Sequence, residues 1–319
     1  MLKDRYGRRL RYLRVSVTDR CNFRCLYCSR DFSEWLPRED ILSLEEIREV
    51  VAAAVSLGVE RVRLTGGEPL VRRDFPHLVR MLSEIPGLRD LSLTTNGYRL
   101  AELARELKQA GLHRVNLSLD TLKAERFREL TGVDGLSRVL SGLEAALSVG
   151  LHPVKVNMVV MRGVNEDEIL EMARLSLSEP LEVRFIEFMP VGPGVSWEEE
   201  RFLPLAEIME RVRELGPLEE VPSQGGGPAR VFRLPGARGR VGFIAAISRH
   251  FCDRCNRLRL TAEGRLRLCL FSEEEFDLRP YLGRGPEVLR EALLEAVRRK
   301  PFGKELSGKR RRPMRAIGG

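Results

Sequence analysis

The chain has 319 residues, of which 43% are hydrophobic and 31% charged, a balance typical of a soluble protein with a substantial core. Its 54 lysines and arginines exceed its 46 acidic residues, and the net charge of +8 suits an anionic partner such as a nucleotide. No apolar run of about 18 residues occurs, which argues against a membrane-spanning helix. The first residues lack the apolar centre of a secretory signal. We therefore expect a cytoplasmic protein without membrane contact.

Apolar, β-rich segments alternate with helical segments through the first two thirds of the chain. The expected strands cover residues 12–18, 61–66, 90–96, 114–120, 154–161 and 183–190. Between them, residues 43–58 and 101–112 have the periodicity of amphipathic helices, and Ser43 with Glu46 predicts a capping box at the start of the first. This alternation predicts βα units around a parallel sheet.

Six such units are too few for a closed eight-stranded barrel, so they predict an open partial barrel or a doubly wound sheet. In either fold the functional residues gather at the carboxyl ends of the strands. After about residue 200 the rhythm changes, and the Gly/Pro-rich segment 222–243 predicts short antiparallel strands. A last helix is expected from Pro286 to about Arg299. We expect two regions, 1–200 and 201–319.

The six cysteines form two groups of three. A disulfide framework belongs to small secreted domains, so this grouping favours two metal sites. The first group, Cys21, Cys25 and Cys28, has C-x3-C-x2-C spacing directly after the first expected strand. Three thiolates on one short loop can hold three irons of a [4Fe–4S] cluster and leave the fourth iron open to a small molecule. A zinc site with a distant fourth ligand is the alternative.

The second group, Cys252, Cys255 and Cys269, has C-x2-C-x13-C spacing and again has no obvious fourth ligand. C-x2-C is a frequent zinc-binding pair, and His250 lies two residues before it. Spacing alone therefore leaves zinc and an iron–sulfur cluster equally open for this group.

Two motifs resemble those of the radical S-adenosylmethionine superfamily, namely CNFRCLYC at 21–28 and GGEP at 66–69. The narrower resemblance is to the GTP 3′,8-cyclase family of molybdenum cofactor biosynthesis. It is carried by residues 13–28, 63–74, 93–97, 116–120, 154–169, 184–192, 251–271 and 318–319. The chain departs from that family's pattern in the SRD that follows Cys28. The resemblance implies an α/β fold, a partial (β/α)6 barrel with a carboxy-terminal, antiparallel, cluster-binding extension.

By this resemblance, each cysteine group binds a [4Fe–4S] cluster with one open iron. S-adenosylmethionine binds the first open iron and the guanine of GTP binds the second. The residues that match positions around S-adenosylmethionine are Tyr27, Gly67, Ser118 and Met189. Gly67 is expected to offer its carbonyl, because a residue without Cβ lets the ligand come close. We expect the two clusters to face each other across the barrel mouth.

Six residues match positions around GTP, and five of them are cations suited to the triphosphate. They are Arg14, Arg63, Thr94, Lys155, Arg257 and Arg259. Arginine can pair with phosphate oxygens in bidentate fashion. Arg14 and Arg63 stand in otherwise apolar strands, where a buried charge is unfavourable unless it meets a partner. Arg257 and Arg259 are two residues apart and so share one face of a strand. Exposure at the surface or an internal ion pair is the alternative for these arginines.

The implied reaction removes the 3′ hydrogen from the ribose of GTP and joins C3′ to C8 of guanine. It gives 3′,8-cyclo-7,8-dihydroguanosine triphosphate, with 5′-deoxyadenosine and methionine as co-products. In the family the terminal glycines, here Gly318 and Gly319, reach the active site, so we expect them to take part in catalysis. The expected partners are a flavodoxin or ferredoxin as reductant and cyclic pyranopterin monophosphate synthase as the next enzyme. The sequence does not decide between a monomer and a homodimer.

Two other functions are compatible with parts of the sequence. One is a peptide-modifying radical S-adenosylmethionine enzyme with auxiliary clusters, although such enzymes often carry longer cysteine arrays. The other is a zinc-ribbon protein that binds nucleic acid. Aromatic residues make up only 6% of the chain, which disfavours stacking on bases, so we expect no nucleic-acid partner.

Overall fold

The computed structural model describes residues 1–28, 35–189, 199–223, 227–249, 251–302 and 314. A single sheet runs through it in the strand order β12-β11-β10-β1-β2-β3-β4-β5-β6-β9-β8-β7. Its central strands are the six expected from the sequence, and they pair in parallel. They are β1 (Tyr12–Ser16), β2 (Arg61–Thr65), β3 (Asp90–Thr95), β4 (Arg114–Ser118), β5 (Lys155–Val160) and β6 (Glu182–Glu187). Because β12 and β7 end this order without pairing with each other, the sheet forms an open partial barrel.

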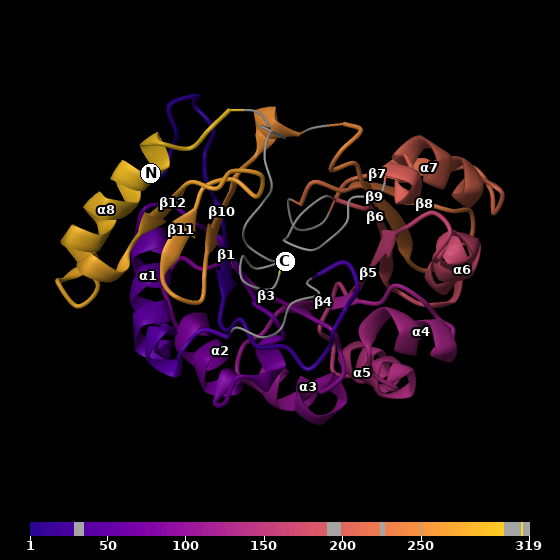
Figure 1. Cartoon of the computed structure of the whole chain (residues 1–319), viewed down its shortest axis with the longest axis horizontal. Helices are drawn as coiled ribbons and strands as arrows, with labels where there is room; N and C mark the ends of the chain where they lie inside the picture. Colours follow the sequence, from indigo (N-terminus) through magenta and orange to yellow (C-terminus); the bar gives the residue numbers. More distant parts are fainter. Residues whose placement is uncertain (29–34, 190–198, 224–226, 250, 303–313, 315–319) are drawn as a thin grey trace.

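Helices cover the convex outer side of the curved sheet (Figure 1). In chain order they are α1 (Leu44–Ser56), α2 (Phe75–Ser83), α3 (Leu100–Gln109), α4 (Ala124–Thr131), α5 (Leu136–Ser148), α6 (Ile169–Ser178), α7 (Leu205–Arg213) and α8 (Pro286–Arg298). Short 3-10 helices are η1 (Arg38–Asp40), η2 (Pro69–Val71), η3 (Glu166–Glu168), η4 (Glu199–Arg201), η5 (Cys252–Arg254) and η6 (Arg279–Tyr281). The capping box predicted for α1 is present, because Ser43 and Glu46 each accept a hydrogen bond from the other's backbone amide.

The two faces of the sheet differ in polarity. Residues that point outward toward the helices are apolar and fully buried, such as Leu13 and Val15 of β1 or Val62 and Leu64 of β2. The alternate residues, which point inward, are mostly polar or charged. Parallel strands covered on both faces usually read as continuous apolar runs. The alternation here therefore indicates that the inner face contacts a polar ligand rather than a second apolar layer.

The carboxy-terminal region adds strands to both edges of the barrel. They are β7 (Glu219–Val221), β8 (Arg230–Arg233), β9 (Arg240–Ile244), β10 (Arg257–Leu260), β11 (Arg265–Arg267) and β12 (Glu275–Asp277). The expected antiparallel pairing is present within β7-β8-β9 and within β10-β11-β12. The sequence did not predict that β9 pairs in parallel with β6 and β10 in parallel with β1. The division near residue 200 stays a prediction.

Among the helices of the described residues, none has both the length and the apolar character needed to cross a membrane.

Candidate active site

The first cysteine group lies on the loop that leaves the carboxyl end of β1. Cys21, Cys25 and Cys28 are half-buried cysteines that form no disulfide with one another. The backbone amides of Arg24 and Leu26 donate to carbonyls at the end of α4, at 2.7 and 3.0 Å. These bonds fasten the loop to the barrel between its cysteines, so the backbone fixes how the thiols are presented.

Two of these thiols, those of Cys21 and Cys25, are poor acids in the free protein. Burial, with a smaller effect of Glu68, raises the pKa of Cys21 to about 12. Burial and the two neighbouring thiols raise the pKa of Cys25 well above its usual range. Such thiols ionise when a metal replaces the proton. Within the described residues, no three His, Cys, Asp or Glu side chains converge on the position of one metal ion. A cluster spreads three thiolates over three irons, and three thiols on one short loop fit that arrangement.

The Gly66–Gly67 pair packs against the same loop. A Cβ atom on Gly67 would overlap the carbonyl oxygens of Asp19 and Arg20, and one on Gly66 would overlap that of Thr18. Gly66 also has a φ of +151°, which other residues rarely adopt. From the sequence, the glycine at 67 was expected to let a ligand come close. The structure gives a different reason for the glycine, the close approach of backbone to backbone, while the ligand contact of its carbonyl stays a prediction.

Glu68, the next residue of the GGEP motif, joins the ends of β2 and β3. Its buried carboxylate accepts hydrogen bonds from the amide of Leu70 at 3.0 Å, the amide of Asn96 at 2.7 Å and the hydroxyl of Thr95 at 2.7 Å. Burial raises the pKa of Glu68 to about 7, although these donors act in the opposite direction. The motif therefore holds two strand ends together beneath the cysteine loop.

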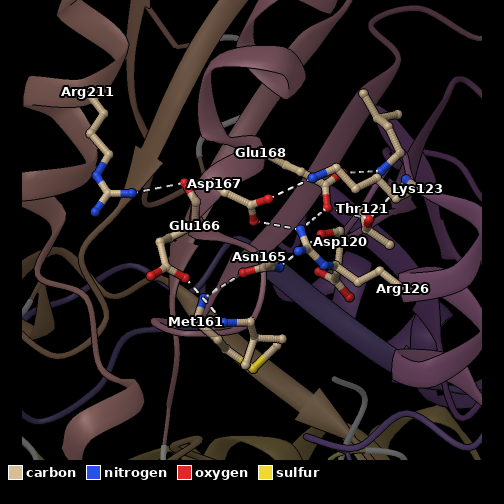
Figure 2. A network of polar contacts seen from close by, with 12 residues as sticks. Asp120, Thr121, Lys123, Arg126, Met161, Asn165, Glu166, Asp167, Glu168 and Arg211 are labelled. Atoms are coloured by element: carbon tan, nitrogen blue, oxygen red, sulfur yellow. Dashed lines mark hydrogen bonds and ion pairs between the residues drawn. The ribbon is translucent and has the colours of Figure 1, made fainter.

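Asp120, just beyond β4, holds the cysteine loop from the opposite side. Its Oδ2 accepts from the Tyr27 hydroxyl at 2.6 Å, and its Oδ1 accepts from the amide of Val159 at 2.8 Å. Asn165 Nδ2 donates to the carbonyls of Asp120 and Val159, both at 2.9 Å, and its Oδ1 accepts from the amide of Met161 (Figure 2). The aromatic residue inside the cysteine loop is thus tied to the ends of β4 and β5.

A layer of charged residues supports this joint from outside (Figure 2). Buried Glu168 accepts from the Thr121 hydroxyl at 2.6 Å and pairs with Arg126. Arg126 also pairs with Asp167 at 2.6 Å, as does Lys123 at 2.7 Å. The NEDE stretch that follows β5, residues 165–168, therefore has a structural role, because its side chains fasten the ends of β4 and β5.

The other residues expected to contact S-adenosylmethionine lie at the same end of the sheet. Ser118 is the last residue of β4, and Met189 lies just after β6; both are half-buried. Together with Tyr27 and Gly67 they surround the end of the barrel that carries the first cysteine group. Their contacts with the ligand stay predictions.

Cations gather on the inner face of neighbouring strands. Arg14 of β1 is in register with Arg63 of β2 on one side and with Arg259 of β10 on the other. Arg257 and Arg259 share this face, as their spacing indicated. Lys155 of β5 is buried on the inner face, where its charge interacts with that of Arg63. The five cations named from the sequence therefore line one surface.

Burial and repulsion by neighbouring cations make the charges of Arg14, Arg63 and Arg259 unfavourable in the free protein. Burial, then Arg259, lowers the pKa of Arg14 to about 9. Burial lowers the pKa of Arg63 to about 9, and burial with Arg257 lowers that of Arg259 to about 10. An anion bound among them would relieve this cost.

Arg63 shows the local arrangement most clearly. Its Nε lies 3.4 Å from the Ser92 hydroxyl, and the Asn116 amide oxygen, when turned toward the guanidinium, accepts from it at 2.9 Å. Its guanidinium lies 5.4 Å from the centre of the Tyr12 ring. In the described part of the chain these partners are all uncharged, so the positive charge is available to an anion.

Two inner-face arginines were not identified from the sequence. Arg114 of β4 pairs with Asp90, and Arg184 of β6 pairs with Glu182, which also lies 3.4 Å from the Lys155 ammonium. Burial, then repulsion by Arg184, lowers the pKa of Lys155 to about 7. The signal used for Arg14, an arginine inside an apolar strand, would also have found Arg184 in RFIE.

Several buried polar atoms on the inner face have no hydrogen-bond partner among the described residues. They are the hydroxyls of Tyr12 and Thr94, Nη1 of Arg114, Oδ1 of Asn157 and Nη2 of Arg184. Buried polar groups are normally satisfied in folded proteins. Their concentration on this face fits a polar ligand that completes them, and Thr94 was among the residues predicted to contact GTP.

The second cysteine group lies beside the amino end of β10. Cys252 and Cys255 lie just before this strand, and Cys269 follows β11, which returns antiparallel to it. All three are half-buried free thiols. Burial raises the pKa of Cys252. Burial also acts on Cys255, but Lys300 and Arg257 outweigh it and lower the pKa of that thiol.

The two cysteine groups lie at opposite ends of the parallel strands, so the expectation that they face each other across one mouth was wrong. β10 is parallel to β1 with Arg257 opposite Tyr12, and Cys255 precedes β10. Cys21 follows β1 at the other end. At about 3.3 Å per residue, the length of β1 separates the two ends by about 13 Å. The cations stand between them. The expected residues His250, Gly318 and Gly319 lie outside the described residues.

Comparisons with known proteins identify the family of the chain. The profile of the radical SAM superfamily matches residues 15–176, and the profile named Molybdenum Cofactor Synthesis C matches residues 181–306. The chain is 51% identical to the GTP 3′,8-cyclase of Pelotomaculum thermopropionicum over the full length of both. It is 49% identical to that of Heliobacterium modesticaldum over 99% of both chains.

The fold likeness extends to more distant solved structures. The crystal structure of Streptococcus suis SuiB bound to S-adenosylmethionine matches with a TM-score of 0.68 over 93% of this chain and 67% of that chain, at 15% identity. That identity supports likeness of fold alone. The profile and the full-length relatives confirm the predicted family and leave the zinc-ribbon alternative unsupported. The chain therefore belongs to the GTP 3′,8-cyclase family of the radical SAM superfamily.

Proposed function

We propose that this chain converts GTP to 3′,8-cyclo-7,8-dihydroguanosine triphosphate. The observation that carries the proposal is the cation-lined inner face between two groups of three cysteines. A nucleoside triphosphate combines a base, a sugar and a polyanion, and the site offers a place for each. The inner-face cations suit the polyanion, and the two cysteine groups suit two clusters.

In this proposal Cys21, Cys25 and Cys28 hold the cluster that binds S-adenosylmethionine. With both bound, the cluster and S-adenosylmethionine would supply the 5′-deoxyadenosyl radical that takes the hydrogen from C3′ of the ribose. The chain's own contribution is orientation, because Glu68 and Asp120 fix the loop against the ends of four strands, β2 to β5. C3′ then bonds to C8 of guanine, and one electron and one proton complete the product.

The second group, Cys252, Cys255 and Cys269, holds the cluster whose open iron binds the guanine. Arg14, Arg63 and the other inner-face cations position the triphosphate, with Thr94 as an added donor. The inner-face cations lie between the two cysteine groups. A nucleotide held by these cations therefore has its ribose between the end of the barrel that binds the base and the end that generates the radical.

The direct test is an anaerobic assay of the reconstituted chain with GTP, S-adenosylmethionine and a reductant. The proposal expects about eight irons and eight sulfides per chain, and equal amounts of 5′-deoxyadenosine and cyclised nucleotide. Stoichiometric zinc in place of iron, or 5′-deoxyadenosine with no change in GTP, would contradict it.

We further propose that Gly318 and Gly319 act in the cyclisation step, that a flavodoxin or ferredoxin supplies electrons and that cyclic pyranopterin monophosphate synthase takes the product. Deletion of the two glycines should abolish cyclised nucleotide and leave both clusters in place. Iron content and product analysis of the truncated chain test this. Full activity after truncation would refute the role of the glycines.

A further inference from the structure

Two buried cations from opposite ends of the chain converge on the second cysteine group. Arg8 belongs to the amino-terminal segment, where Lys3 and Arg9 form an isolated bridge. Lys300 follows α8 and is only 1% exposed. Neither residue belongs to the inner face of the barrel, and the proposed reaction assigns no role to them.

Arg8 holds the start of the second group. Its Nη1 donates to the carbonyl of Cys252 at 2.7 Å, and its Nη2 donates to the carbonyl of Pro301 at 2.7 Å. Its Nε pairs with buried Asp4 at 2.6 Å. The guanidinium therefore joins the amino-terminal segment, the cysteine turn and the residues after α8 in one connection.

Lys300 holds the other two cysteine positions. Its ammonium donates to the carbonyl of Arg257 at 3.0 Å and also to the carbonyl of Leu268. Arg257 lies two residues after Cys255, and Leu268 directly precedes Cys269. Each of the three cysteines thus has, at or within two residues of it, a backbone carbonyl held by Arg8 or Lys300.

The charge of these two residues matters as well as their geometry. Lys300 interacts electrostatically with Cys255 and Cys269, and Arg8 with Cys252 and Cys255. Three thiolates around an iron–sulfur core carry net negative charge, and nearby charges and hydrogen bonds set the reduction potential of such a core. A buried cation that cannot move to solvent favours the reduced state of the iron–sulfur core, because that state carries more negative charge.

We propose that Arg8 and Lys300 form a positioning clamp that shapes the second cysteine group for its cluster and raises the reduction potential of that cluster. The inference rests on the proposed function, because it takes the second group to be a cluster site. It also makes the first ten residues and the end of α8 necessary parts of that site.

The test uses the full chain with Cys21, Cys25 and Cys28 replaced by alanine, so that only the second group can bind iron. After anaerobic reconstitution with iron and sulfide, this parent should hold about four irons.

Lys300→Met removes the hydrogen-bond donors as well as the charge, and it should weaken iron retention against a chelator about 10–100-fold. Lys300→Gln keeps two N–H donors without the charge, so iron retention should recover while the reduction potential becomes more negative. Arg298→Gln, at an exposed position on α8, is the matched control and should behave as the parent.

The outcomes separate the clamp from the proposed function. If the parent itself binds no iron, or binds zinc, the cluster assignment fails. If the parent binds iron and Lys300→Met retains it equally well with an unchanged potential, the clamp alone is refuted. Should Lys300→Met fail to fold, as judged by its melting transition, the potential of Lys300→Gln decides. A potential equal to that of the parent overturns the charge role.

Discussion

Replacing Arg63 by methionine should make the free protein more stable and its binding of GTP weaker. Burial lowers the pKa of Arg63 from 12.5 to about 9. At about 1.4 kcal/mol per pKa unit, that shift corresponds to an upper bound of roughly 5 kcal/mol for holding the charge inside the barrel. The group is protonated in both states at pH 7. The folded state therefore bears the full cost there, and the cost declines only as the pH rises from about 9 toward 12.5.

Methionine is of similar length and removes this cost. Ser92 keeps its bond to the carbonyl of Val62, so of the two neighbours only Asn116 is left without a partner. An unsatisfied neutral group costs about 1–3 kcal/mol, so the expected net gain is at most about 2–4 kcal/mol. The melting temperature of the chain before reconstitution should rise by a few degrees. Loss of a charge-assisted bond to phosphate should weaken GTP binding about 10–100-fold.

Calorimetric melting of the chain before reconstitution and anaerobic titration of the reconstituted chain with GTP measure the two effects. Arg89→Met is the control, because the side chain of Arg89 is 78% exposed and its replacement should change neither quantity. A lower melting temperature together with unchanged GTP affinity would refute the reasoning that Arg63 is kept charged for a ligand.

Three further predictions concern the end of the barrel that carries the first cysteine group. Tyr27→Phe removes the hydrogen bond to Asp120, so it should destabilise the chain by about 1–3 kcal/mol and weaken S-adenosylmethionine binding. Melting measures the first effect and ligand titration the second, and an unchanged affinity would show that the bond does not position the loop. The pKa of Glu68 is raised to about 7, so the folded state binds the extra proton and stability should fall by about 3 kcal/mol as the pH rises from 4.5 to 7. Denaturant titrations should show that Glu68→Gln removes this slope; an identical slope in the variant would assign it to other groups. Gly67→Ala should displace the cysteine loop and lower the iron content. Gly227→Ala is the control and should leave the iron content unchanged, because its added Cβ would meet nothing closer than 3.8 Å. Equal iron content in the two variants would contradict the packing argument.

The sequence predicted the barrel well because each strand can be recognised from its own residues and those next to it. The six parallel strands, the capping box at Ser43 and the helix that begins at Pro286 depend on periodicity and end signals within a dozen residues. The cations on the inner face follow from the same alternation, since Arg14 and Arg63 are each flanked by apolar residues that point to the helices.

What the sequence could not supply are the contacts between distant segments. Nothing near Cys255 shows that β10 pairs in parallel with β1, and this pairing places the second cysteine group at the opposite end from Cys21. The contacts of Arg8 and Lys300 across the chain are hidden for the same reason. The glycine at 67 was recognised, but its packing against the cysteine loop depends on a neighbouring strand.

The central claim is that GTP lies along the cation-lined inner face with its ribose toward the first cysteine group. The most direct measurement uses GTP carrying deuterium at C3′, with mass spectrometry of the 5′-deoxyadenosine formed in a single anaerobic turnover. The account predicts one deuterium in 5′-deoxyadenosine. It also predicts that Arg63→Met forms less of this labelled product at GTP concentrations that saturate the unaltered enzyme. Unlabelled 5′-deoxyadenosine alongside cyclised nucleotide that still carries the deuterium would contradict it.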